Sequence, residues 1–129
     1  MRPQFLILDE PTSLLPAPVA GRLISTVKDM GRREGMGVIH VTHSMSEAAL
    51  FERVIVMEAG RLVMDGTPAE IFRRVDELRR IGLDVPLGAS IAHRLRSRGV
   101  QLEGEILNYE DLRRAISALK SPRAKAPGP

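Results

Sequence analysis

The chain begins with a short apolar run that ends in two carboxylates. Residues 5–8, Phe-Leu-Ile-Leu, are followed by Asp9, Glu10 and Pro11. An uninterrupted apolar run of this length is typical of a strand buried on both faces of a parallel sheet. A second run, residues 38–42, is mostly β-branched and is followed by His43. Both runs are predicted to be strands, and ligands bind at the carboxyl ends of such strands.

Apolar residues between the two runs recur at spacings of three and four. They predict an amphipathic helix over about residues 19–33, with Pro18 in its first turn and with Gly31 and Gly35 marking its end. Two parallel strands joined by a right-handed crossover helix end at the same edge of a sheet. We therefore expect Asp9, Glu10 and His43 to meet at one edge.

The rest of the chain carries clear helix and turn signals. Ser44 and Glu47 form a capping-box pattern, Thr67 begins another, and Asn108 is placed to cap a helix. The predicted elements are a short helix from Ser44 to about residue 50, a hairpin with strands 54–57 and 61–65, and helices over about 68–81, 89–98 and 109–120. Residues 82–88 are predicted to form a linker.

Three parts are expected on this basis. Residues 1–81 form an α/β domain, residues 82–120 form a small helical extension, and residues 121–129 form a tail. The tail combines three prolines with a glycine and two basic residues, so we expect it to be disordered. No internal repeat is visible.

Composition and charge narrow the class of protein. The 129 residues are 43% hydrophobic and 27% charged, which is ordinary for a globular protein, and the absence of cysteine excludes disulfides and thiolate metal sites. The net charge is +3, but the arginines alternate with acidic residues, so specific nucleic-acid binding is not expected. No signal-peptide pattern and no apolar run near the roughly 20 residues of a membrane span is present. We expect a cytoplasmic chain, or one peripheral to a membrane partner.

The adjacent carboxylates of Asp9 and Glu10 indicate a candidate chemistry. Two neighbouring carboxylates repel each other, and burying either is costly without a cation or a proton. A divalent metal with an attacking water suits both, with Asp9 holding Mg²⁺ and Glu10 polarising the water. His43 could then contact a phosphate or that water. The alternatives stay open here: a strand end that enters a solvated loop, and a histidine that only begins a helix.

These residues resemble the ATP-binding subunit of ABC transporters. Residues 6–13 look like the Walker B strand with its catalytic glutamate, residues 41–44 look like the switch-histidine loop, and residues 53–72 look like the strands and helix that follow. Residues 82–120 resemble the C-terminal extension of energy-coupling-factor and cobalt-type ATPases. The resemblance implies an α/β fold, a partial P-loop NTPase sheet with flanking helices and a small helical extension.

The resemblance also implies a function and roles for the site residues. Asp9 would coordinate Mg²⁺ through water, Glu10 would be the general base, and His43 would sense the γ-phosphate of ATP. The cofactors would be ATP and Mg²⁺. The chain would pair with another ATPase subunit as a homo- or heterodimer and join membrane transport subunits of an importer. It would then lie at the cytoplasmic face of the membrane.

The chain departs from the family pattern in several places. It contains no G-x-x-x-x-G-K-[ST] loop, so the backbone amides and lysine that cradle phosphates are missing. The Gln loop and the signature sequence are also missing, and all three precede the Walker B strand in the family. We therefore expect the C-terminal half of an ATPase subunit that is inactive by itself. Pro16 follows Leu15 where the family has an aspartate at the dimer contact, so that contact is expected to differ.

Two other functions remain open. The chain could be a non-catalytic, degenerate paralogue that dimerises or regulates through residues 82–120. It could also be an ABC-type ATPase of DNA repair, although no heptad pattern indicates the coiled coil usual there. Asp9, Glu10 and His43 together favour the transporter ATPase, because an interaction module has no need of them.

Overall fold

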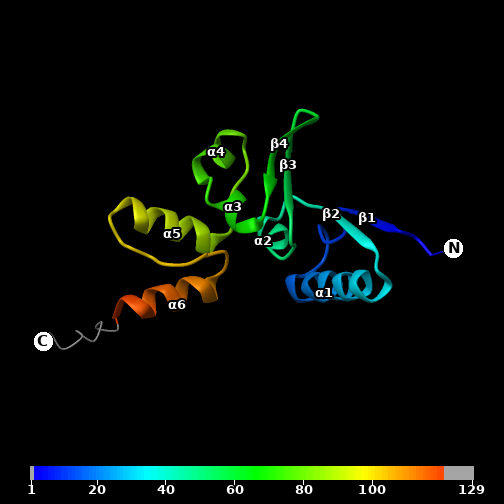
Figure 1. Cartoon of the computed structure of the whole chain (residues 1–129), viewed down its shortest axis with the longest axis horizontal. Helices are drawn as coiled ribbons and strands as arrows, with labels where there is room; N and C mark the ends of the chain where they lie inside the picture. The colour runs from blue at the N-terminus through cyan, green and yellow to red at the C-terminus, as the bar shows by residue number, and fades with distance from the viewer. Residues whose placement is uncertain (1, 121–129) are drawn as a thin grey trace, which may run out of the picture. The chain divides into compact units, whose positions relative to one another are not determined.

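A computed structural model describes residues 2–120 of the chain, and it divides into two compact units between Ala48 and Ala49 (Figure 1). The first unit contains an α/β arrangement, and the second contains a hairpin followed by helices. The boundaries predicted from the sequence, at residues 81 and 120, stay predictions. The predicted disorder of the tail concerns residues 121–129, which lie outside the described residues.

The first unit is built on two parallel strands. β1 (Phe5–Asp9) pairs with β2 (Gly37–Val41) in a register that places Phe5 beside Gly37 and Asp9 beside Val41. The helix α1 (Ala17–Glu34) connects them, and α2 (Met45–Ala48) follows β2 (Figure 1). This arrangement confirms the predicted strand–helix–strand unit, and both strands end at the same edge of the sheet.

α1 extends beyond one of the glycines that were predicted to end it. Ala20, Ile24 and Val27 are buried along its apolar face, and Gly31 is buried with them. A Cβ atom at Gly31 would lie 2.8 Å from the Val38 side chain, so the glycine allows α1 to approach β2 closely. The prediction that Gly31 marks the helix end is wrong. The helix ends at Gly35, whose φ of 64° is readily reached only by glycine.

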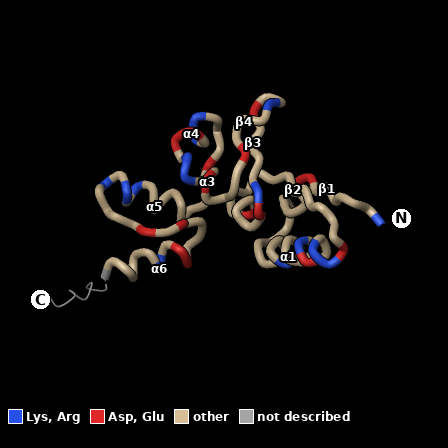
Figure 2. The backbone as a smooth tube through the Cα atoms, in the orientation of Figure 1, with Lys and Arg blue, Asp and Glu red and all other residues tan. Residues whose placement is uncertain are grey.

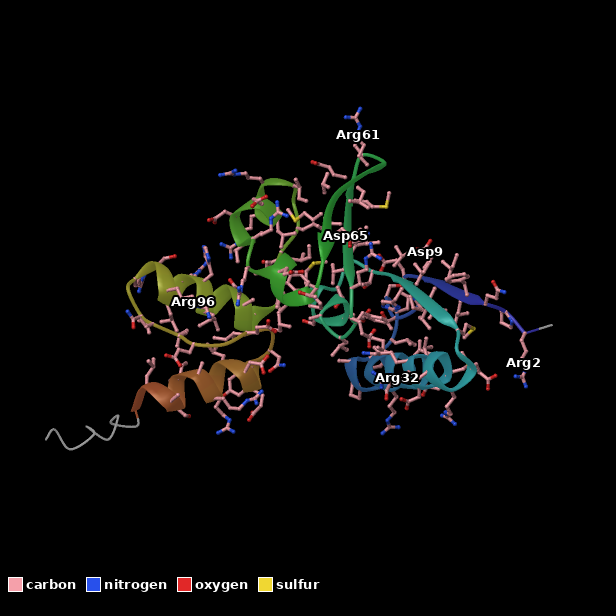
Figure 3. All side chains as sticks on the ribbon, in the orientation of Figure 1. Arg2, Asp9, Arg32, Arg61, Asp65 and Arg96 are labelled. Atoms are coloured by element: carbon pink, nitrogen blue, oxygen red, sulfur yellow. The ribbon has the colours of Figure 1, made fainter. Side chains whose placement is uncertain are left out.

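The second unit begins with an antiparallel hairpin. β3 (Val54–Glu58) pairs with β4 (Arg61–Gly66), and the turn between them contains Ala59 and Gly60, both with positive φ. Arg53 donates two hydrogen bonds to Asp65, at 2.7 Å from Nε and 2.5 Å from Nη2. Figure 3 shows Arg61 at the tip of this hairpin. The predicted hairpin is thereby confirmed.

The helix predicted over residues 68–81 is wrong in its length, because the structure has two short helices there. α3 (Pro68–Phe72) begins with the predicted capping box, in which Thr67 N donates to Glu70 Oε2 at 2.8 Å and Glu70 N donates to Thr67 Oγ1 at 3.3 Å. α4 (Val75–Arg80) begins after Arg74. The ψ of Arg74 is 50°, which lies outside the helical region and breaks the helix although no glycine or proline stands there.

Two longer helices complete the second unit. α5 (Leu87–Ser97) and α6 (Tyr109–Lys120) agree with the predicted helices, and Asn108 Oδ1 caps α6 by accepting from Asp111 N at 2.9 Å. Their contact contains a buried apolar cluster of Ala92, Leu102, Ile106 and Leu112. The helices of this unit thus cover a core of their own.

Residues of both charge signs occur along α1, α4 and α6 (Figure 2). Several form ion pairs three residues apart, among them Arg113 with Glu110 at 2.5 Å and Arg114 with Asp111 at 2.6 Å. This agrees with the interpretation of the mixed charges as solvated surface. No helix within residues 2–120 has the length and apolar character that a membrane span requires.

Candidate functional site

Glu10 lies where the chain turns out of β1. Its φ is 47°, a left-handed conformation that few non-glycine residues adopt. Its N–H donates to the Val41 carbonyl at 2.9 Å, which extends the pairing of β1 with β2 by one residue. Its own carbonyl accepts from Ser13, at 3.3 Å from the backbone N and 3.1 Å from Oγ. A left-handed residue of this kind is held by its surroundings, and such positions are common in active sites.

The structure brings two of the predicted site residues together. His43 Nε2 lies 3.2 Å from Glu10 Oε1, and the His43 side chain is 90% exposed whereas that of Glu10 is 32% exposed. The contact lacks the geometry of a hydrogen bond, and among the described residues Oε1 has no hydrogen-bond donor although it is shielded from solvent. Shielded acceptors without a donor are uncommon in folded proteins, and such an atom calls for an explanation such as a functional role.

Asp9 is the exposed last residue of β1 and immediately precedes Glu10 in the chain (Figure 3). Within residues 2–120, no group of three or more His, Cys, Asp or Glu side chains could hold a metal ion by itself. Mg²⁺ in phosphate-transfer sites is held by one or two carboxylates, with the remaining ligands from phosphates and water. A single oxygen ligand from Asp9 fits that coordination.

A third group of side chains, which we term the Glu47 cluster, was not predicted from the sequence. It consists of Glu47 on α2, Thr12 in the loop after β1, His40 on β2 and Thr42 after β2. Thr12 Oγ1 donates to the Glu47 carboxylate at 2.7 Å from Oε1 and 2.9 Å from Oε2. His40 Nε2 lies 2.9 Å from Glu47 Oε2, and Thr42 Oγ1 donates to the same oxygen at 3.1 Å. One carboxylate thus links α2 to the segments that follow both strands.

The predicted capping box at Ser44 forms only in part. Glu47 N approaches Ser44 Oγ at 3.4 Å, as a capping box requires. The reciprocal bond is missing, because Ser44 N donates to Thr42 Oγ1 at 2.9 Å and the Glu47 carboxylate turns into its cluster instead. The helix that follows is also shorter than predicted, since α2 ends at Ala48. A partly buried carboxylate with three side-chain partners has replaced a local cap.

Burial and hydrogen bonding act in opposite directions on Glu47. Burial raises the pKa of the Glu47 carboxyl, but the hydrogen bonds from His40, Thr12 and Thr42 lower it further than burial raises it. The pKa of Glu47 is therefore below its ordinary value, and the group is ionised at neutral pH. A signal for this cluster was present in the sequence, since His40 and Thr42 alternate with apolar residues and polar groups on a covered strand face need partners.

The comparisons with known proteins come from whole-sequence and structural similarity, since the chain matches no family model. It is 44% identical over 112 residues to the energy-coupling factor transporter ATP-binding protein EcfA1 of Caldanaerobacter subterraneus subsp. tengcongensis, which covers 87% of this chain and 40% of that relative. It is 37% identical over 121 residues to the cobalt import ATP-binding protein CbiO of Syntrophus aciditrophicus, which covers 94% of this chain and 43% of that relative. The chain thus spans less than half the length of these relatives.

A solved structure gives the same result. The cbiO1 protein of Clostridium perfringens, described as part of the ABC transporter complex cbiONQ, superposes with a TM-score of 0.53 at 28% identity. The match covers 74% of this chain and 37% of that one. The resemblance found in the sequence is confirmed, because over most of its own length the chain is similar to ATP-binding proteins of the energy-coupling-factor and cobalt-import kind and to part of an ABC transporter complex.

Proposed function

We propose that this chain supplies the hydrolytic part of an ATP-binding subunit of an energy-coupling-factor or cobalt-type importer. The observation that carries the proposal is the contact between Glu10 and His43, 3.2 Å apart at the carboxyl ends of two parallel strands. This is the edge at which α/β sheets bind their ligands. An interaction module has no reason to hold an unbonded carboxylate oxygen beside an exposed imidazole.

Each of the three site residues has a role in this proposal. Glu10 accepts a proton from the attacking water through its carboxylate, whose Oε1 atom has no hydrogen-bond partner among the described residues. The exposed His43 ring donates a hydrogen bond to the γ-phosphate from one nitrogen while its other nitrogen can accept one. Asp9 would hold Mg²⁺, directly or through water, and the ion would supply positive charge that neutralises the phosphates.

The phosphate-binding loop is missing from this sequence, so the proposal assigns nucleotide binding to residues outside it. We propose that the chain acts with an upstream half of the same subunit, as a homo- or heterodimer with another ATPase subunit. Its further partners are membrane transport subunits, which place it at the cytoplasmic face of the membrane. The names of the relatives support these partners, because they are transporter ATP-binding proteins and one belongs to a cbiONQ complex.

The missing loop also favours a second candidate, a non-catalytic paralogue that acts as a dimerisation or regulatory module. The two candidates agree on the isolated chain, which should bind Mg-ATP weakly and hydrolyse none. Micromolar binding in a calorimetric titration of the 129-residue chain would contradict both. They differ once a phosphate loop is supplied.

The deciding experiment supplies that loop from a relative. This chain is placed after the part of the Caldanaerobacter EcfA1 protein that precedes the matched region, and the product is called the joined protein. Release of inorganic phosphate from Mg-ATP is measured with and without Glu10→Gln. Because a general base contributes about 10²–10⁴ in rate, Glu10→Gln should lower kcat by at least about 100-fold and leave ATP binding intact.

Glu34→Gln is the matched control, since it makes the same substitution at an exposed residue near the end of α1. It should leave the rate unchanged. Full activity of Glu10→Gln would remove Glu10 from the site. A joined protein that binds ATP but hydrolyses none would favour the non-catalytic paralogue.

A further inference from the structure

The Glu47 cluster concentrates four short contacts on one carboxylate. Both Glu47 oxygens accept from Thr12 Oγ1, and Oε2 is also approached by His40 Nε2 and Thr42 Oγ1, all between 2.7 and 3.1 Å. Local helix capping would need only one of the two oxygens. The carboxylate instead serves side chains from 5 to 35 residues away in sequence, so its function extends beyond α2.

The cluster is shielded from solvent, which makes its hydrogen bonds hard to replace. The Glu47 side chain is 16% exposed, that of His40 is 3% exposed, and Thr12 is 6% exposed. Removing one partner of a buried hydrogen bond leaves the other unsatisfied, which costs more than the bond itself contributes. The cluster therefore holds its members in one arrangement.

The positions of the two threonines connect the cluster to the candidate site. Thr12 lies two residues after Glu10, inside the turn that Ser13 closes on the Glu10 carbonyl. Thr42 immediately precedes His43, and its Oγ1 also accepts from Ser44 N at 2.9 Å on the other side of that histidine. The Glu47 carboxylate is bonded to both threonines at once. It thus ties together the two loops that carry Glu10 and His43.

We propose that Glu47 is a positioning residue that keeps the Glu10 carboxylate and the His43 ring together by bonding Thr12 and Thr42 simultaneously. The assignment rests on the proposed function, because it gives the Glu10–His43 contact a purpose in hydrolysis. Glu47 itself does not contact the reacting atoms. It acts through the two threonines.

The first test uses the 129-residue chain and does not depend on hydrolysis. Nuclear Overhauser effects between the His43 ring protons and the Glu10 side chain are measured by NMR well below the melting temperature, together with the Glu10 amide shift. In Glu47→Gln, an amide with one acceptor oxygen replaces the carboxylate, so the His43–Glu10 signals should be lost. Thr12→Val, which removes only the hydroxyl that bonds Glu47, should also lose them while α2 keeps its own hydrogen bonds.

Ser46→Ala is the matched control, because Ser46 is an exposed residue on the same short helix. It should retain the signals. If Glu47→Gln fails to fold, the Thr12→Val chain decides. Persistence of the His43–Glu10 signals in a folded Glu47→Gln or Thr12→Val chain overturns the proposal, and Glu47 is then only a structural contact of α2.

The second test measures turnover in the joined protein. A positioning defect acts on the assembled site, so Glu47→Gln and Thr12→Val should each lower kcat by about tenfold while the KM for ATP changes less than about threefold. A loss in kcat/KM that comes from a higher KM, with kcat unchanged, would contradict the proposal. If the joined protein lacks hydrolysis altogether but the NMR signals respond as expected, the proposed function fails whereas the positioning by Glu47 stands.

Discussion

Two regions of this chain shield different kinds of side chain from solvent. In the helical part of the second unit, Phe72, Ile71, Leu78 and Val75 are almost completely buried and supply an apolar core. In the first unit, α1 covers one face of the β1–β2 sheet. The other face leaves Phe5, Ile7, Ile39 and Val41 between 46% and 65% exposed. The side-chain hydrogen bonds of the Glu47 cluster, which belongs to the first unit, are partly buried.

The difference shows what each region depends on. The helical region is held by apolar volume, so its stability should respond to changes in side-chain size. The first unit places its predicted chemistry beside a polar cluster, so its site geometry should respond to the loss of single hydrogen bonds. Substitutions of equal size in the two regions should therefore have unequal effects.

The largest expected effect is the loss of a core aromatic side chain. Phe72→Ala removes a ring that is 2% exposed, which should lower the free energy of unfolding by about 3–5 kcal/mol. Ile7→Ala, at a side chain that is 65% exposed, should cost less than about 1 kcal/mol. Urea denaturation followed by circular dichroism compares the two. Similar costs would mean that the exposed sheet face contributes as much as the helical core.

Two glycines give a second comparison with identical chemistry. A Cβ atom at Gly88 in α5 would lie 2.4 Å from the Asn108 carbonyl oxygen and 2.7 Å from its carbon, both of them backbone. Gly88→Ala should therefore destabilise the chain by about 1–3 kcal/mol. Gly21 in α1 has nothing within 4 Å of the same position. Gly21→Ala should stabilise by about 0.5–1 kcal/mol, because alanine favours helices.

The same denaturation experiment measures both glycine variants. A destabilising Gly21→Ala would mean that α1 has little room on that side. A neutral Gly88→Ala would mean that α5 and the Asn108 cap can separate without cost.

The next effect concerns ATP hydrolysis by the joined protein and the site residues of the first unit. In the joined protein, His43→Ala should lower kcat by at least about tenfold, which corresponds to roughly 1.4 kcal/mol of transition-state stabilisation. ATP affinity should change much less, because the ring acts when nucleotide, metal and Glu10 are assembled. His43→Asn separates the roles, since it keeps a polar side chain at the helix entry. Hydrolysis at the wild-type rate in His43→Asn would assign His43 to the local structure alone.

Much of the fold could be predicted because its signals are local. The apolar run before Asp9 and the helix period that follows determine the parallel pair, and Thr67 with Glu70 marks a helix start that the structure confirms. The break at Arg74 could not be predicted, since residues 71, 72, 75 and 78 also fit one continuous apolar helix face. The course of α1 beyond Gly31 depends on a close approach to β2, which is a tertiary feature.

The candidate site was likewise predictable only where its signals are local. The predicted topology places Asp9, Glu10 and His43 at the ends of the two strands. In the structure, His43 Nε2 lies 3.2 Å from Glu10 Oε1. The role of Glu47 was hidden, because its spacing from Ser44 indicates a local capping box. Its actual partners include Thr12, which lies 35 residues earlier. The alternation at His40 and Thr42 indicates that these polar groups need partners, but a single sequence does not identify a partner so far away along the chain.

The smallest expected effect is a pH dependence that belongs to the first unit. The pKa of Glu47 is lowered in the folded chain from its ordinary value of 4.5, because the hydrogen bonds from its cluster outweigh burial. A carboxyl group whose pKa falls on folding stabilises the folded state at pH values above 4.5, and this contribution is lost as the pH drops through the folded pKa. Wild type should therefore be more stable than Glu47→Gln at pH 7, and this difference in stability should narrow below pH 4.5.

Urea midpoints of both chains at pH 7 and pH 3.5 measure this difference in stability. Glu110→Gln is the control, because its carboxylate pairs with Arg113 on the exposed face of α6 and solvent screens that pair. A gap for Glu47→Gln that is equal at both pH values would show that its hydrogen bonds do not depend on the ionised carboxylate.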